Sequence, residues 1–239
     1  MFIAPLKSKI MSLAPLNPAG LQTKLTRRDF ARNLALLTLA LSAGTTRGAD
    51  DGGIRNTVIL IIRHAEKPAE KDNVNLAPEG FERAKRYAKY FKEYTIEGKP
   101  LELGTIIAAE NSDASHRPVE TVTPTSQAMP DVPFKHSVGN DDFQTVADRF
   151  TKGNHNGKNA LICWHHGNIP KLLAALGVKD NYFPMERKKN GKEEPAWPED
   201  VFCWLFQLTY DKDGKLSVEA KNVMLMPGDD KFPAPMPIK

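Results

Sequence analysis

The sequence predicts a three-layer α/β/α fold, in which helices cover both faces of a mostly parallel sheet and a C-terminal β-hairpin is added to the sheet. From residue 57 onward, short aliphatic runs alternate with amphipathic segments, which is typical of repeated strand–helix units. The aliphatic runs are apolar at consecutive positions, as expected for strands buried on both faces. The last two runs flank the turn sequence DKDG at residues 211–214, and this arrangement predicts a hairpin.

Four strands and four helices are expected before the hairpin. The strands are predicted at residues 57–62, 103–109, 132–138 and 159–164, and the helices at residues 77–94, 117–129, 141–153 and 168–177. In the first helix, Phe81, Ala84, Ala88 and Phe91 recur at helical spacing and predict its buried face. Pro124 lies in the middle of the second helix and predicts a kink or a later start.

The segment from residue 178 to residue 198 interrupts this alternation. It is rich in charged residues, glycine and proline, and it shows no clear periodicity. We expect a long loop here, and long loops in compact domains often border a functional site.

The chain has two cysteines, Cys163 and Cys203, and each lies within an apolar run. Cysteine is a common core residue, so we interpret both as buried thiols. A single disulfide between them is the alternative that the sequence leaves open.

The first 49 residues have the order of an export signal. Paired arginines in TRRDF at residues 26–30 precede an apolar run at residues 34–43, and small residues continue to Ala49. This order is typical of a signal peptide, and the arginine pair is typical of the twin-arginine type. We therefore expect residues 1–49 to engage the twin-arginine export machinery and residues 50–239 to form one periplasmic or extracellular domain. An uncleaved amphipathic N-terminal helix is the alternative.

The distribution of charge limits the expected partners. Seven of the 33 basic residues lie in residues 1–49, but only one of the 29 acidic residues does. The basic excess therefore belongs to the leader, and the domain itself is slightly acidic. Nucleic acid is not an expected partner of such a domain. The apolar run of the leader is too short for a stable membrane anchor, and the sequence leaves the oligomeric state open.

Polar side chains follow three of the predicted strands. Arg63 and His64 come directly after the first strand, His165 and His166 follow the fourth, and the loop after the second leads to Arg117. In an open α/β sheet, ligands bind beyond the carboxyl ends of the strands. Guanidinium groups bind phosphate oxygens in a bidentate manner. The sequence therefore predicts that these side chains meet in one anion-binding pocket.

Four motifs, taken in order, resemble the histidine phosphatase superfamily, which has the phosphoglycerate-mutase-like fold. They are RHAE at residues 63–66, LAPEGFERA at 76–84, RPVET at 117–121 and WHHGNIP at 164–170. The resemblance implies that His64 attacks phosphorus and becomes a phosphohistidine, while Arg63 and Arg117 bind the phosphoryl oxygens. A second histidine, from WHHGNIP, would donate hydrogen bonds to the same oxygens as charge develops. A neutral imidazole suits the first role because it is a competent nucleophile near neutral pH.

The identity of the second histidine is open between His165 and His166. The letters HGN starting at His166 match the phosphoglycerate-mutase branch of the superfamily, whereas the pattern HxxxIP starting at His165 matches another branch. Side chains alternate along a strand, so only one ring would face the pocket if the strand continued through this pair. We favour His166.

The acid that protonates the leaving oxygen is also open. The superfamily uses a carboxylic acid for this step, and no carboxylate here matches a clear pattern. Glu66 is close to His64 in the sequence, Asp141 and Asp142 follow the third strand, and Glu110 lies at a strand end. We take Glu66 as the catalytic candidate.

Together with these residues, the resemblance implies a metal-independent phosphatase that hydrolyses a small-molecule phosphate monoester through phosphorylated His64. No cofactor or metal is expected, because two arginines and a histidine supply the positive charge. An exported module that binds a phosphate ligand with little or no turnover is the alternative from another class. A metal hydrolase is less favoured because the sequence has no HExxH motif, and a mutase is less favoured because export would separate it from glycolytic substrates.

Overall fold

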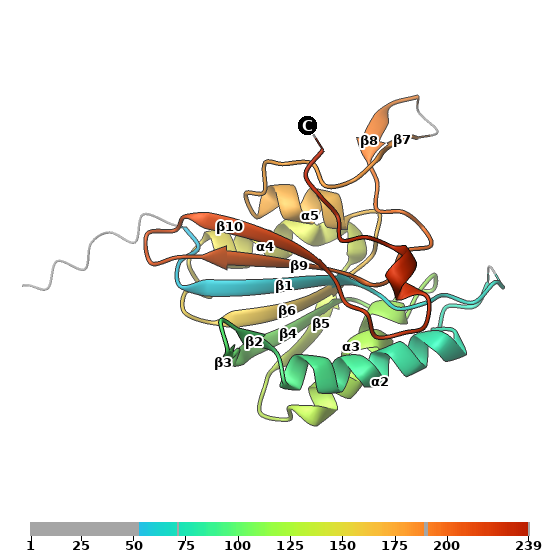
Figure 1. Cartoon of the computed structure of the whole chain (residues 1–239), viewed down its shortest axis with the longest axis horizontal. Coiled ribbons are helices and arrows are strands. Elements are labelled where there is room, and N and C mark those ends of the chain that lie inside the picture. Colours follow the sequence, from blue (N-terminus) through green and yellow to red (C-terminus); the bar gives the residue numbers. More distant parts are fainter. Residues whose placement is uncertain (1–52, 71, 189–190, 239) are drawn as a thin grey trace, which may run out of the picture. The chain divides into compact units, whose positions relative to one another are not determined.

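The computed structural model describes residues 53–70, 72–188 and 191–238. The predicted export signal at residues 1–49 lies outside the described part. Within that part, one six-stranded sheet forms the centre of the domain (Figure 1). No helix there is long and apolar enough to cross a membrane.

The bounds of the elements follow the predicted runs closely. The strands of the sheet are β1 (Thr57–Arg63), β4 (Leu103–Ala109), β5 (Phe134–Val138), β6 (Asn159–Trp164), β9 (Trp204–Tyr210) and β10 (Leu216–Asn222). The α-helices are α2 (Pro78–Lys92), α3 (Arg117–Ala128), α4 (Phe143–Thr151) and α5 (Ile169–Ala175). Two 3₁₀ turns, η1 (Asn140–Asp142) and η2 (Asp229–Lys231), precede α4 and the C-terminal tail. Each of α2, α3 and α5 has proline in its first turn, where the missing N–H costs no helical hydrogen bond.

The strand order is β10-β9-β1-β6-β4-β5. The pairs β1–β6, β6–β4 and β4–β5 are parallel, whereas β9 is antiparallel to both β1 and β10. The β9–β10 pair is the hairpin expected around DKDG. The predicted fold class, a mostly parallel sheet with a C-terminal hairpin, is therefore confirmed.

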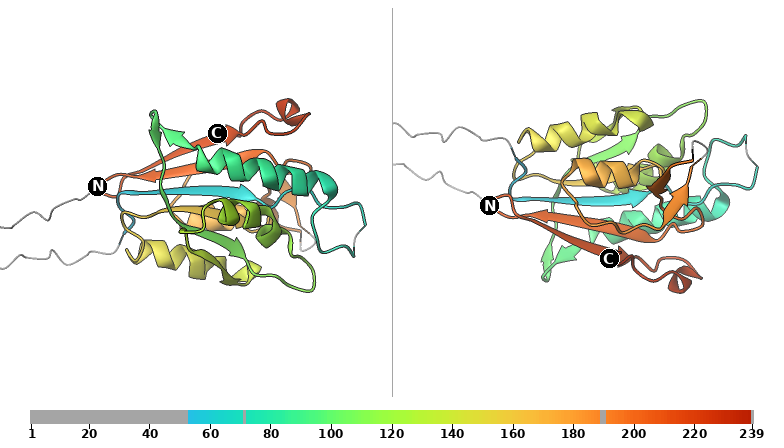
Figure 2. Two further views of the ribbon diagram at one scale, coloured as in Figure 1. Left: turned by 90° about the horizontal axis from the view of Figure 1, so that it is seen from below. Right: turned by 90° about the horizontal axis from the view of Figure 1, so that it is seen from above.

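Helices cover both faces of this sheet. Tyr87 and Phe91 of α2 and Val122 of α3 pack with inward residues of β1 and β6 on one face. Phe150 of α4 and Leu172 of α5 pack on the other face. Figure 2 shows α2 and α3 in front of the sheet in one view, and α4 and α5 in front of it in the opposite view. Each strand of the centre is thus apolar on both sides, as its continuous aliphatic run predicted.

The buried face of α2 differs from the prediction. Phe81 is 42% exposed, while Arg83 is only 2% exposed. Ala84 and Phe91 are buried as predicted, and Tyr87 joins them. Arg83 was not among the residues predicted on the buried face, because a charged residue is rarely buried without a partner and its partners lie far away in the sequence.

Three other expectations can be compared with the structure. The segment from 178 to 198 is not a continuous loop, because it contains the hairpin of β7 (Met185–Arg187) and β8 (Glu193–Pro195). Helix α3 starts at Arg117 and runs through Pro124, so a later start is wrong. Both cysteines are free and buried, which confirms the thiol interpretation. A short hairpin of β2 (Thr95–Ile96) and β3 (Lys99–Pro100) was not predicted.

Candidate active site

The pairing of β1 with β6 brings the two histidine motifs together. Arg63 is in register with Trp164 at the carboxyl ends of these parallel strands, and the main-chain N–H of His64 donates to the Trp164 carbonyl at 3.0 Å. The centre of the His64 ring lies 5.2 Å from that of His165 and 6.4 Å from that of His166. The predicted meeting of imidazoles at this edge of the sheet is therefore present in the structure.

The ring of His64 is held in one tautomer. Its Nδ1 lies 2.7 Å from the carbonyl oxygen of Ala65, and because a carbonyl can only accept, Nδ1 carries the proton. The lone pair is then on Nε2. Burial lowers the pKa of His64 well below its usual value, and the charge of Arg63 lowers it further. His64 is thus a neutral imidazole at pH 7.

Both residues of the His165–His166 pair lie near His64. Strand β6 ends at Trp164, so the alternation of side chains along a strand does not separate the two rings. Burial lowers the pKa of each to about 4, with the charge of Arg117 as the next cause at His165 and that of Arg63 at His166. Nδ1 of His166 is buried and has no hydrogen-bond partner among the described residues.

Arg63 is fully buried at the end of β1. Its Nη1 donates to the carbonyls of Pro198, Glu199 and Val201 at 2.9, 2.8 and 3.1 Å, and its guanidinium carbon lies 4.1 Å from the centre of the Phe202 ring. Its Nε and Nη2 are buried without a partner in the described part of the chain. Burial lowers the pKa of Arg63 to about 9, so the group is a cation at pH 7 with one unsatisfied edge.

Arg117 is the first residue of α3. Its Nη1 donates to the Asn73 carbonyl at 3.0 Å and its Nη2 to the Ala114 carbonyl at 3.5 Å, while its buried Nε has no partner among the described residues. Its positive charge lowers the pKa of both His165 and Arg63, so Arg117 acts electrostatically on the same site. Two cations with unsatisfied N–H groups beside neutral imidazoles form a site for an anion.

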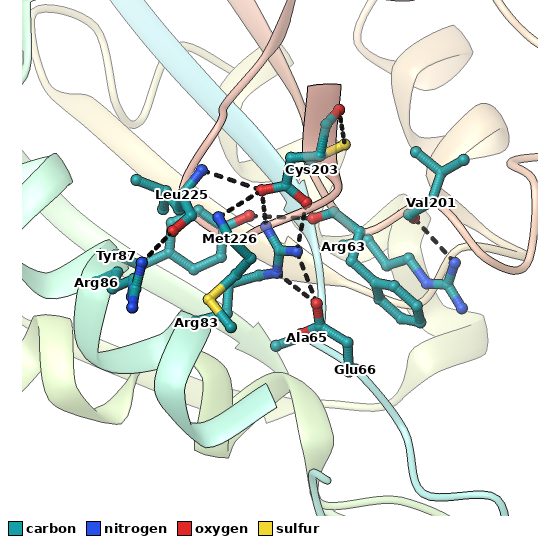
Figure 3. Close-up of polar contacts among 12 residues, drawn as sticks. Arg63, Ala65, Glu66, Arg83, Arg86, Tyr87, Val201, Cys203, Leu225 and Met226 are labelled. Carbon is teal, nitrogen blue, oxygen red and sulfur yellow. Dashed lines mark hydrogen bonds and ion pairs between the residues drawn. The ribbon is translucent and has the colours of Figure 1, made fainter. Parts of the chain in front are cut away.

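Glu66 is held by an arginine that the sequence did not single out. Nε and Nη2 of Arg83 donate to Oε1 of Glu66 at 2.9 and 2.6 Å, and Nη1 and Nη2 donate to the two oxygens of Asp229 at 2.9 and 2.7 Å. Figure 3 shows the Arg83 guanidinium between Glu66 and the C-terminal segment near Leu225 and Met226. Oε2 of Glu66 is buried and has no described partner.

Close packing of α2 against the RHAE segment explains part of the LAPEGFERA motif. The N–H of Ala77 donates to the Glu66 carbonyl at 2.9 Å. A Cβ at Gly80 would lie 2.5 Å from the same oxygen, so only glycine fits there.

The remaining acid candidates have other positions. Asp141 accepts a hydrogen bond from Nδ2 of Asn168 at 2.9 Å, and its charge opposes the lowering of the His165 pKa, so it lies beside the histidine pair. Glu110 is exposed and borders a separate groove along β5. No described hydrogen bond joins Asp142 or Glu110 to the histidines. Among described residues, no group of three or more His, Cys, Asp or Glu side chains is placed to hold a metal ion.

Several residues of the site were missed from the sequence. Glu199 pairs with Lys67 at 3.3 Å, and this hydrogen bond lowers the pKa of Glu199. Phe202 packs its ring 6.2 Å from that of His64. Arg83 and Asp229 complete the ion-pair network. Arg83 carried a signal, because it lies within LAPEGFERA, and Asp229 carried a weaker one in LMPGD at residues 225–229; the segment around Glu199 has no readable pattern.

No family model and no curated protein matches the sequence. Solved structures that resemble the chain include a proposed phosphohistidine phosphatase, SixA, from Agrobacterium tumefaciens (16% identity, 70% of this chain and 99% of that chain, TM-score 0.43). Two others are phosphoglycerate mutases. The one from Plasmodium falciparum has 16% identity and a TM-score of 0.38, and the one from Bacillus anthracis has 12% identity and a TM-score of 0.42. Each comparison covers 72% of this chain and 94% of the other chain. All three are members of the histidine phosphatase superfamily, which the sequence motifs also resemble. At these identities and TM-scores the likeness carries no inference about activity, which has to be argued from the site.

Proposed function

We propose that the protein is a histidine phosphatase that hydrolyses a small-molecule phosphate monoester through phosphorylated His64. The observation that carries this proposal is the state of His64. Its ring is neutral, its proton is on Nδ1, and it lies within the electrostatic influence of two arginines that have unsatisfied N–H groups. A nucleophile next to an anion-binding site is the arrangement that phosphoryl transfer to nitrogen requires.

The reaction has two steps. In the first, Nε2 of His64 attacks phosphorus, the N–P bond forms, and the bond from phosphorus to the leaving oxygen breaks. The leaving alcohol takes a proton from the carboxyl group of Glu66. In the second, water attacks phosphorus, the N–P bond breaks and returns the electron pair to Nε2 of His64, inorganic phosphate leaves, and a proton from the water returns to Glu66. Arg63, Arg117, His165 and His166 bind the phosphoryl oxygens in both steps, with His166 donating as charge develops.

The environment of Glu66 supports its role as the acid. Arg83 is shared between the carboxylates of Glu66 and Asp229, so one cation faces two negative charges and a proton on Glu66 leaves Asp229 paired. Hydrogen bonds from Arg83 also orient Oε1 of Glu66, while its buried Oε2 is free to hold a proton. Esters with good leaving groups are expected to react faster, because they depend less on a proton from Glu66.

The proposal is tested with the purified protein on a panel of phosphate monoesters that includes a generic aryl phosphate, with and without a chelator. We expect hydrolysis that the chelator does not reduce, and an acid-quenched sample should contain protein heavier by one phosphoryl group. His64→Ala should lose both signals. His136→Ala is the matched control, because His136 is exposed in β5, on the far side of β4 from the histidine pair.

The Glu66→Gln variant tests the role of Glu66 as the acid separately from the role of His64 as the nucleophile. This variant should lose more activity on alkyl phosphates than on aryl phosphates, because an aryl leaving group departs without a proton. Phosphate binding without turnover of any ester would overturn the enzymatic proposal and favour the binding module. Full activity of His64→Ala would overturn the mechanism.

Export through the twin-arginine pathway is proposed from the sequence of residues 26–49 alone. The test is fractionation of a bacterial host that has this pathway and expresses the full chain. We expect the domain in the periplasm, and we expect it to stay in the cytoplasm when Arg27 and Arg28 are both replaced by lysine. The proposal would be overturned if the unmodified chain and the double lysine variant were distributed in the same way between periplasm and cytoplasm.

A further inference from the structure

A hollow of about 580 Å³ adjoins the histidine cluster and is not used by the phosphoryl-binding groups. Two residues join the two regions. Glu66, the proposed acid, lies on its wall, and so does Phe202, whose ring packs against both His64 and the Arg63 guanidinium. A phosphoryl group held at Nε2 of His64 would therefore have its ester oxygen, and the organic part beyond it, on the side of this hollow.

The hollow is built from three segments that are distant in the sequence. Glu79 comes from the first turn of α2, Asp200 and Phe202 come from the loop before β9, and Met226 and Phe232 come from the C-terminal segment around η2. Arg83 and Asp229 tie this C-terminal segment to α2 and to Glu66. The walls are thus fixed by the buried ion-pair network, and they present aromatic and thioether surface to an occupant.

The charges of the hollow favour one kind of occupant. Four carboxylates and two cations line it, so it carries a net negative charge. Arg83 is already engaged by Glu66 and Asp229, so the exposed Lys231 is the cation that remains to face the carboxylates of Glu79 and Asp200. No described cation forms an ion pair with Glu79 or Asp200, which both lie at the exposed margin. A leaving group with a second phosphate or a carboxylate would be repelled there, whereas a cation beside aromatic rings and carboxylates is stabilised.

We propose that this hollow binds the leaving alcohol of the substrate, and that the alcohol carries a positive charge next to an apolar surface. The substrate class is the phosphate monoester of an amine-bearing, partly apolar alcohol. This inference rests on the proposed function, because it places the substrate's phosphoryl group at His64. Glu79 and Asp200 select the charge, and Phe202, Met226 and Phe232 contact the apolar part.

The test uses three aryl phosphates that differ only in a para substituent attached through a methylene group. The substituents are trimethylammonium, methyl and carboxylate, and each ratio of rates is compared with the same ratio in the variants, so that differences in phenol acidity cancel. At low ionic strength we expect kcat/KM to fall in that order, by roughly tenfold from first to last, since exposed charges each contribute a few-fold. The difference should shrink at high salt.

Variants identify the residues responsible. Asp200→Asn and Glu79→Gln should each reduce the preference for the trimethylammonium ester over the carboxylate ester, and Asp200→Lys should reverse this preference. Asp213→Asn is the matched control, because Asp213 lies in the β9–β10 turn at the opposite end of the sheet. Hydrolysis of all three esters at equal rates in every variant, or a preference for the carboxylate, would overturn the subsite and leave the proposed function standing. No hydrolysis of any of the three would overturn the proposed function itself.

Discussion

Nδ1 of His64 lies 2.7 Å from the carbonyl oxygen of Ala65, and this single contact determines which ring nitrogen is available for chemistry. The residue that provides the carbonyl is itself held. The Ala65 N–H donates to Oγ1 of Thr121 at 2.9 Å, and the Thr121 hydroxyl donates to the carbonyl of Arg117 at 2.7 Å. A chain of three hydrogen bonds therefore links the tautomer of the proposed nucleophile to the first turn of α3, which carries the second arginine.

Thr121→Val tests this linkage. Valine has nearly the same shape, but the buried N–H of Ala65 loses its acceptor, which costs about 1–3 kcal/mol of stability. As a positioning residue for His64, Thr121 should also affect kcat more than KM, by roughly tenfold, and Thr121→Ser should restore most of the activity.

The control for Thr121 is Thr123→Val. The Thr123 hydroxyl donates to the Val119 carbonyl within the same helix at 2.8 Å, and it has no described link to His64. Similar loss of kcat in both variants, or failure of serine to restore it, would show that Thr121 contributes only to folding.

Arg63 connects the proposed phosphate site to the loop before β9. Its Nη1 holds three carbonyls of residues 198–201 while its other edge is unsatisfied. Arg63→Lys keeps the charge, but one ammonium group cannot bind the loop carbonyls and the phosphoryl oxygens at the same time. We expect kcat/KM to fall on the order of a hundredfold and the amides of the loop to exchange hydrogen faster with solvent.

Hydrogen exchange with mass detection measures the second effect. Arg86→Lys is the control, since Arg86 is an exposed arginine that also donates to a main-chain carbonyl, that of Leu225. It should change neither activity nor exchange at residues 198–201. Loss of activity in Arg63→Lys with unchanged exchange would contradict the clamping role of Nη1.

The buried network of Glu66, Arg83 and Asp229 should matter for stability. Burial alone would lower the pKa of Arg83, but hydrogen bonds to Asp229 and Glu66 outweigh it and raise that pKa. Arg83→Met leaves two carboxylates without their cation, and we expect it to lower the free energy of unfolding by about 3–5 kcal/mol. Asp229→Asn should cost less, because the amide oxygen can still accept from the N–H groups of Leu225 and Met226.

Urea denaturation of the two single variants and the double variant measures their coupling. The double variant should lose less than the sum of the two single losses. Glu82→Gln, which removes an exposed i,i+4 partner of Arg86, should cost no more than about 0.5 kcal/mol. A loss of that small size in Arg83→Met would contradict a stabilising role of the network.

The sequence predicted the sheet and the histidine cluster because both depend on local patterns. Continuous aliphatic runs identify buried strands, and parallel strands place the residues that follow them at one edge, so His64 was predicted to meet the His165–His166 pair. Arg83 could not be recognised as buried, because its two partners lie 17 residues before it and 146 residues after it. The carbonyls that hold Arg63 were also unpredictable, since main-chain contacts leave no mark on residue identity.

The pH dependence of stability follows from the low pKa values of the site histidines. Those of His165 and His166 are lowered to about 4, and that of His64 is lowered well below its usual value, all mainly by burial. An unfolded chain binds a proton at each histidine below about pH 6.5. Between about pH 6.5 and 4 the unfolded state therefore binds more protons than the folded state, so the stability must fall as the pH is lowered.

Each such histidine contributes a slope of up to about 1.4 kcal/mol per pH unit. Urea denaturation at pH 7.5, 6.0 and 5.0 should show a progressive loss of stability, and His165→Asn should reduce the slope. The pKa of His155, at the other end of β6, is also lowered, so it contributes to the slope without being part of the site.

Inorganic phosphate separates the contribution of the site histidines to the pH dependence of stability from that of His155. A bound anion stabilises the protonated site histidines and raises their pKa values, so phosphate should flatten the pH dependence of the unmodified protein. It should flatten the pH dependence of the His155→Asn variant to the same degree, because His155 does not face the anion. It should flatten the slope less in a variant that lacks both His165 and His166, because His64 is then the one site histidine left to respond. An identical slope with and without saturating phosphate would mean that the anion does not bind beside these imidazoles, and the proposed phosphoryl site would then have to lie elsewhere.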